Sequence, residues 1–178
     1  MKPTPSKAAM LLFFGLAHVA ALSDPITAAR ALIVRTAPKL AHSFKLELAP
    51  GNAESMQLDS DGHSIILRGS GAIELASAFH WYCNDYLNVT FDWNTYGAQQ
   101  LPTSADALPM PATSAVVPRR LKWSYYMNVC TYGYSLAFVP WAYWETHIDW
   151  MAINGINVRA LCEDSISTNL HHACSRRI

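Results

Sequence analysis

Charged residues are scarce in this sequence, and neither sign prevails. Only 15% of the 178 residues are charged, and the 13 basic and 13 acidic side chains give a formal net charge of zero. Such a balance argues against a surface for nucleic acid or an anionic membrane. Disorder of most of the chain is also excluded, because 51% of the residues are hydrophobic. A folded protein that binds neither nucleic acid nor a lipid surface is expected.

The chain is also short and poor in cysteine. A (β/α)8 barrel needs about 200 to 250 residues or more, so a barrel enzyme within 178 residues would be incomplete. The four cysteines are too widely spread to define a disulfide scaffold, and they allow three pairings. They are Cys83, Cys130, Cys162 and Cys174. No pairing is favoured.

The first 23 residues have the pattern of a secretory signal peptide. Lys2 and Lys7 precede an apolar run over 8–22, and small residues stand just before Asp24. The alternatives are a transmembrane anchor, for which the run is short, and a core helix, which needs no basic flank. A secreted chain can be glycosylated, and Asn88-Val89-Thr90 is an N-glycosylation acceptor motif.

Residues 24–118 are expected to form a small α/β domain and its linker. Hydrophobic periodicity and turn residues predict a helix and three strands. These are helix 26–36 behind Asp24-Pro25, strand 43–48, a strand around Met56 and Leu58, and strand 64–68. A two-residue turn at Asp61-Gly62 is expected to join the last two strands in a hairpin.

A second helix is predicted after Gly69-Ser70-Gly71, over 72–86, with Ser70 as its N-cap. The two glycines could suggest nucleotide binding, but Glu74 stands where the third glycine of that fingerprint belongs. A tight strand-to-helix turn is the better interpretation. Another strand is expected at 89–93, and the proline-rich stretch 97–118 reads as a linker or an extended edge.

Residues 119–157 predict a strand, a helix and a second extended segment. The strand is expected over 122–130, the helix from Pro140-Trp141 to Asn154-Gly155, and the second segment from Ile156. This order is the start of a βαβ unit with parallel strands. Half of the chain's aromatic residues lie here, which favours a hydrophobic core over a ring-lined sugar pocket. Glu145 and Asp149 are expected on a solvated face of the helix.

Several motifs in this region resemble glycoside hydrolase family 89, the alpha-N-acetylglucosaminidases. They are 125–131 (YYMNVCT), Tyr134-Ser135, 141–145 (WAYWE) and 148–157 (IDWMAINGIN). Residues 65–87 resemble the small α/β domain that precedes the barrel in this family. The fold class implied is α/β: a small amino-terminal α/β domain over 24–118, followed over 119–157 by the first βα unit of an incomplete (β/α)8 barrel.

The resemblance implies a retaining lysosomal exo-hydrolase that removes terminal α-linked N-acetylglucosamine from heparan sulfate, without a cofactor. Asn128, Cys130 and Tyr134 match family positions that line the N-acetylglucosamine pocket. The two catalytic glutamates of the family lie beyond the last residue of this chain, so no catalytic residue is assigned. We therefore expect the 178 residues alone to be inactive.

The resemblance is expected to end at Asn157 and to leave 158–178 as a divergent tail. This tail holds four zinc-ligand types, Cys162, His171, His172 and Cys174. Their spacing is poor for a zinc site, so no metal is expected. Two other functions stay open: a secreted, non-catalytic module that binds a glycan or a protein through exposed aromatic residues, and a product without stable function.

Overall fold

The structure is a computed structural model that describes residues 24–51, 54–93, 100–126 and 134–157. Four strands form one sheet in the order β1-β3-β2-β4. The strands are β1 (Phe44–Leu48), β2 (Ser55–Ser60), β3 (Ile65–Gly69) and β4 (Ala115–Pro118). The β1–β3 pair is parallel, and β2 pairs antiparallel with both β3 and β4. The predicted extended edge is thus confirmed at 115–118.

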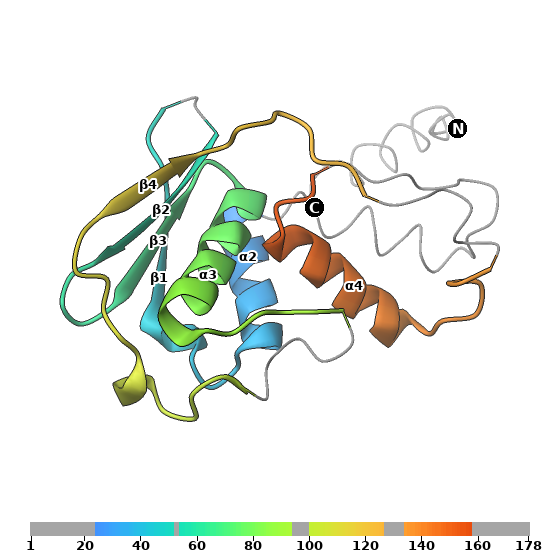
Figure 1. Cartoon of the computed structure of the whole chain (residues 1–178), viewed down its shortest axis with the longest axis horizontal. Coiled ribbons are helices and arrows are strands. Elements are labelled where there is room, and N and C mark those ends of the chain that lie inside the picture. The colour runs from blue at the N-terminus through green and yellow to red at the C-terminus, as the bar shows by residue number, and fades with distance from the viewer. Residues whose placement is uncertain (1–23, 52–53, 94–99, 127–133, 158–178) are drawn as a thin grey trace, which may run out of the picture.

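Two helices cover one face of this sheet (Figure 1). They are α2 (Pro25–Thr36) and α3 (Ala72–Leu87), and both were predicted within a residue or two. Asp24 caps α2 by accepting a hydrogen bond of 3.1 Å from the Thr27 amide. Between the layers lies a core of fully buried apolar side chains that includes Phe44, Leu67 and Phe79.

The opposite face of the sheet carries a ladder of alternating charges. Arg68 on β3 donates to Glu47 on β1 at 2.7 Å and to Asp59 on β2 at 2.8 Å. Lys45 lies 2.9 Å from Glu47. Because these side chains belong to three adjacent strands, the ladder supports the strand register on a face that no helix of the described residues covers.

Three local predictions need correction. The β2–β3 connection spans four residues, 61–64, because the Asp61 carboxylate accepts from the amides of His63 and Ser64 and holds a wider loop. The N-cap of α3 is Gly71, since the Ser70 hydroxyl accepts from the Ser55 amide at the start of β2. Residues 89–93 form no strand, and the Phe91 ring contacts Phe79 and His80 of α3.

The β3–α3 turn is as tight as expected. A Cβ atom at Gly69 would lie 2.5 Å from the backbone nitrogen of Leu75, so only glycine allows this approach of strand and helix. The turn thus has a packing reason for its glycine, which agrees with the structural interpretation of the Gly-Ser-Gly sequence.

The third long helix, α4 (Trp141–Ile153), begins after Pro140 as predicted and ends at Asn154. Gly155 follows with a φ of +73°, a conformation that favours glycine at a helix end. The helix packs on α3, farther from the sheet (Figure 1). None of the helices within the described residues is long and apolar enough to cross a membrane.

Candidate functional site at the barrel start

We call the described residues between 119 and 157 the barrel start. Its first segment, 122–126, was predicted as part of a strand, but only an isolated bridge at Tyr125 is present there. A barrel strand pairs with a neighbour on each side, and among the described residues this segment is hydrogen-bonded to Asn157 in the short segment 156–157. The remainder of the predicted strand, 127–130, lies outside the described residues.

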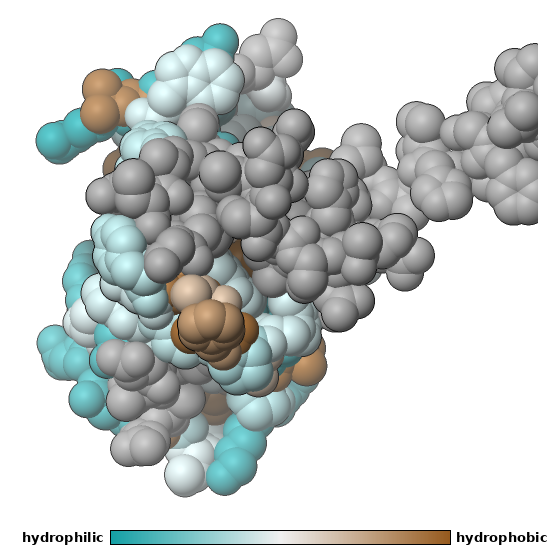
Figure 2. Space-filling model, turned by 90° about the vertical axis from the view of Figure 1, so that its right-hand side faces the viewer, coloured by the Kyte–Doolittle hydropathy of each residue, from teal (hydrophilic) through white to brown (hydrophobic). Residues whose placement is uncertain are grey.

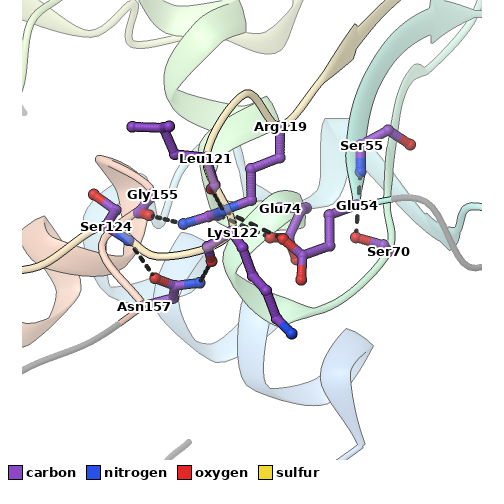
Figure 3. Close-up of polar contacts among 10 residues, drawn as sticks. All are labelled: Glu54, Ser55, Ser70, Glu74, Arg119, Leu121, Lys122, Ser124, Gly155 and Asn157. Carbon is purple, nitrogen blue, oxygen red and sulfur yellow. Dashed lines mark hydrogen bonds and ion pairs between the residues drawn. The ribbon is translucent and has the colours of Figure 1, made fainter.

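Asn157 joins these two segments through three hydrogen bonds (Figure 3). Its backbone amide donates to the Ser124 carbonyl at 3.1 Å, and its Oδ1 accepts from the Ser124 amide at 2.8 Å. Its Nδ2 donates to the Lys122 carbonyl, also at 2.8 Å. The side chain thus supplies the ladder contacts that a longer strand pair would make, and it sets the register of the barrel start.

Arg119 fastens the barrel start to the amino-terminal domain (Figure 3). Its guanidinium donates to Glu74 on α3 at 3.0 Å and to the Gly155 carbonyl at 2.6 Å, and it lies 3.4 Å from the Glu54 carboxylate. One cation therefore connects the end of β4, the first turn of α3 and the turn after α4. Because Arg119 is largely buried, these charge-assisted bonds are shielded from solvent.

A second ion pair ties α4 itself to the amino-terminal domain. Arg35 on α2 donates two hydrogen bonds of 2.7 and 2.6 Å to the Asp149 carboxylate, whose side chain is only 5% exposed. Trp150 adds a hydrogen bond of 3.2 Å from its indole to the Phe91 carbonyl. The prediction that Asp149 lies on a solvated face is therefore wrong: this face of the crossover helix packs on another domain.

The aromatic residues of the barrel start divide between core and surface. Trp144 is buried with Leu136 in a small second core. Trp123, Tyr125, Tyr134 and Phe138 are exposed, Phe138 almost fully. A hydrophobic group stands out on the face of the molecule seen in Figure 2. The expectation of a hydrophobic core is met for part of this set only.

The predicted sugar-binding residues are only partly within the described structure. Asn128 and Cys130 lie outside it, and Tyr134 is 60% exposed in the turn before α4. Asn88 is exposed at the end of α3, with a left-handed φ of 53°. The four tail residues considered for zinc also lie outside, and the described ranges hold no cluster of three or more potential metal ligands.

A cavity of about 620 Å³ lies where the two parts meet. Its lining includes Trp81 and His80 from α3, Arg119 and Arg120 after β4, and Asn154 after α4. Arg119 and Asn157 were not singled out as functional from the sequence. The signal for Arg119 was the change of composition at Arg119-Arg120, but nothing in a single sequence reveals which carboxylates an arginine will meet.

Two family models match the chain. The model of the alpha-N-acetylglucosaminidase (NAGLU) N-terminal domain matches residues 27–110, and that of the NAGLU tim-barrel domain matches 124–172. Human alpha-N-acetylglucosaminidase is 36% identical over 139 residues, which are 74% of this chain and 18% of the human protein. The barrel match runs past Asn157 to residue 172, so it does not support a divergent tail that begins at 158.

Solved structures of a family 89 glycoside hydrolase from Clostridium perfringens have the same fold. The complex with its substrate GlcNAc-alpha-1,4-galactose aligns with a TM-score of 0.70, and the complex with 2-acetamido-1,2-dideoxynojirmycin with 0.68. In each, 85% of this chain and 17% of the other are covered at 22% identity.

These matches define the class, a glycoside hydrolase in which a small α/β domain precedes a (β/α)8 barrel, here with the sheet of the barrel not closed. Within this class the chain belongs to the alpha-N-acetylglucosaminidase family. It spans less than a fifth of the length of the relatives that it matches.

Proposed function

We propose that this chain is the amino-terminal part of a retaining exo-glycosidase that hydrolyses terminal α-linked N-acetylglucosamine from heparan sulfate. The observation that carries the proposal is the 36% identity to human alpha-N-acetylglucosaminidase, which extends over both the α/β domain and the barrel start. The substrate is proposed from the family to which the chain belongs.

The barrel start would supply one wall of the sugar pocket. In (β/α)8 barrels, substrate binds at the carboxyl ends of the strands, and Asn128 and Cys130 follow the first segment at that end. An asparagine amide can both donate to and accept from sugar hydroxyls, and Tyr134 offers a ring and a hydroxyl. Arg119 and Asn157 then serve as positioning residues, because they hold the segment that carries this wall.

Hydrolysis with retention needs two carboxyl groups about 5 to 5.5 Å apart on either side of the glycosidic bond, one as nucleophile and one as acid and base. We assign neither role within these 178 residues, and no cofactor is needed for this chemistry. The chain by itself is therefore expected to be inactive, and its role is to shape and hold the first part of the pocket.

A fluorogenic α-N-acetylglucosaminide tests the proposal in two proteins. The 178-residue chain should release no fluorophore above a buffer blank. A hybrid in which this chain replaces the matching part of human alpha-N-acetylglucosaminidase should hydrolyse the substrate, and Asn128→Ala in the hybrid should raise KM or abolish turnover. As a matched control, Lys45→Met on the outer face of the sheet should leave activity unchanged. Turnover by the chain alone, or a folded hybrid indifferent to Asn128→Ala, would contradict the proposal.

The route of the protein is part of the same proposal. The signal-peptide pattern over 1–23 supports delivery to the secretory pathway, and the family supports the lysosome as destination. In cells, a fluorescent fusion of the chain should lose its first residues and follow lysosomal markers. Cytosolic fluorescence with an intact leader would refute this route.

The second candidate is a non-catalytic glycan- or protein-binding module, favoured by the exposure of Trp123, Tyr125 and Phe138. Exposed aromatic side chains of this kind can contact a glycan or a protein partner. Titration of millimolar N-acetylglucosamine against tryptophan fluorescence separates the two candidates. A saturable change in the chain alone supports a binding module, and no change removes its glycan-binding form.

A further inference from the structure

The contact between α4 and the amino-terminal domain holds a buried histidine, His147, and a half-buried one, His80. His147 on α4 is 3% exposed and lies among five aromatic rings with centroids 5.6 to 6.2 Å away. These rings come from three segments of the chain: Trp93 after α3, Tyr126 in the barrel start, and Tyr143, Trp144 and Trp150 on α4 itself. Neither ring nitrogen of His147 has a hydrogen-bond partner in the described structure.

His80 lies at the other end of the same contact. Its Nδ1 is 3.2 Å from the carbonyl of Ile153, the last residue of α4, and its ring meets Phe91 edge to face. The geometry fits a neutral imidazole whose Nδ1–H donates to this carbonyl. Nε2 is buried and has no partner among the described residues. The cavity beside His80 gives water a path to this side of the contact.

Burial disfavours the charged form of both imidazoles. A charged imidazolium in an apolar site loses its hydration, and burial accordingly lowers the pKa of His147 and of His80 below the ordinary value. For His80, the hydrogen bond to Ile153 opposes this effect only in part. Aromatic faces attract cations, but this attraction does not replace the hydration that a buried imidazolium loses.

The charged groups around these histidines offer no dedicated partner. On α4 itself, Asp149 is bound by Arg35, and Glu145 lies two residues from His147 on another side of the helix. Asp92 belongs to the segment of Trp93, and it has another interaction. Lys122 stands four residues before Tyr126, and its ammonium lies over the Trp123 ring.

On α3, Asp85 accepts from the Trp81 indole, and Glu74 is bound by Arg119. After β4, Arg120 lines the cavity beside His80 and adds a positive charge there. No carboxylate is therefore shown to bind a protonated imidazole of either histidine within the described residues.

We propose that His147 and His80 make the contact between α4 and the amino-terminal domain a proton-sensitive joint, tight when both imidazoles are neutral and loosened when they are protonated. The effect has a definite sign. In the unfolded chain a histidine binds a proton near pH 6.5, whereas in the folded chain burial disfavours this protonation. The contribution of the two histidines to the free energy of unfolding is therefore complete above this pH and is lost as the pH falls below it. The proposal does not depend on the glycosidase function, since it needs only the two imidazoles and their surroundings.

Urea unfolding of the 178-residue chain between pH 7 and pH 5 tests the joint. If His147 stays neutral in the folded chain at pH 5, protonation of this one residue in the unfolded chain raises the unfolding equilibrium constant up to about 25-fold between pH 7 and pH 5. The same holds for His80, so the two together give up to about 600-fold. His147→Phe keeps an aromatic side chain and should remove one such factor, and His80→Asn should remove the other.

The matched control is His63→Asn, which changes an exposed histidine in the β2–β3 loop and should leave the pH dependence as in the wild type. A second measurement covers the case in which a variant fails to fold: the ring protons of His147 and His80 can be followed by NMR in the wild-type chain. Titration of both rings near 6.5 in the folded protein, or an unchanged pH dependence in both variants, would overturn the proposal.

Discussion

The ion pair between Arg35 and Asp149 should be a main source of the stability that α4 gains from the amino-terminal domain. Its two hydrogen bonds measure 2.7 and 2.6 Å, and the Asp149 side chain is 5% exposed while that of Arg35 is 31% exposed. The partners thus differ in their access to water. Replacing Arg35 should therefore change the free energy of unfolding by a different amount than replacing Asp149.

Arg35→Met leaves a buried carboxylate without its guanidinium partner, and a charge deprived in this way costs about 3 to 5 kcal/mol. Asp149→Asn leaves an amide oxygen that still accepts one bond, and the released guanidinium can turn to solvent, so the cost is that of a weakened charged hydrogen bond, about 1 to 3 kcal/mol. The free energy of unfolding should therefore fall more in Arg35→Met than in Asp149→Asn.

Urea unfolding at pH 7, followed by tryptophan fluorescence, measures both changes. The double variant Arg35→Met with Asp149→Leu should recover much of the loss, since an apolar pair can replace a buried ion pair at little cost. As the control, Lys45→Met in the exposed pair with Glu47 should change stability by about 0 to 1 kcal/mol. Equal losses below 1 kcal/mol in both single variants would refute the asymmetric burial on which the reasoning rests.

Three further changes probe other parts of the chain. Gly69→Ala should destabilise the chain by about 1 to 3 kcal/mol in the same urea assay, because the added Cβ would lie 2.5 Å from the Leu75 nitrogen. An unchanged unfolding midpoint would show that β3 and α3 can move apart without cost. Asn157→Ala should lower the free energy of unfolding by about 1 to 3 kcal/mol, because both side-chain hydrogen bonds are lost. Asn157→Asp can still accept from the Ser124 amide and should lower it less, and the reverse order would contradict the assigned roles. The wild-type chain secreted from eukaryotic cells should lose mass when treated with an endoglycosidase, and Asn88→Gln should abolish this loss. A wild-type chain whose mass does not change would disprove glycosylation at Asn88.

The sequence was sufficient to predict the elements that form through local rules. Helices α2 and α3 follow from apolar spacing, and α4 from a proline at its start and a glycine after its end. Strands β1 and β2 follow from the alternation of apolar and polar residues, and β3 follows from the turn residues Asp61-Gly62 before it. Local rules failed where a side chain binds a partner in another element. Ser70 binds the start of β2 and so leaves the helix cap to Gly71.

The candidate site could be predicted only through the family resemblance, because its contacts join residues far apart in the sequence. Asp149 looked solvated from its place on a crossover helix, yet its partner Arg35 is 114 residues away. The segment 89–93 has the alternation of a strand, but Val89 and Phe91 are buried and the Phe91 ring contacts α3. Alternation reports burial on one side, and it does not say whether the neighbour is a strand or a helix.

By its motif α4 belongs to the barrel, but by its packing it belongs to the amino-terminal domain. Ile153 is 1% exposed within the main core, beside residues of α2 and α3. Arg35 and Phe91 hold the same helix by hydrogen bonds, and Arg119 holds the turn that follows it. Since the first helix of a barrel is normally fixed by its neighbouring strands and helices, this anchoring from outside can order the first βα unit before the rest of a barrel is present. The amino-terminal domain would then act as a template on which a barrel sheet begins, and residues that join the two parts would affect the pocket without touching a substrate.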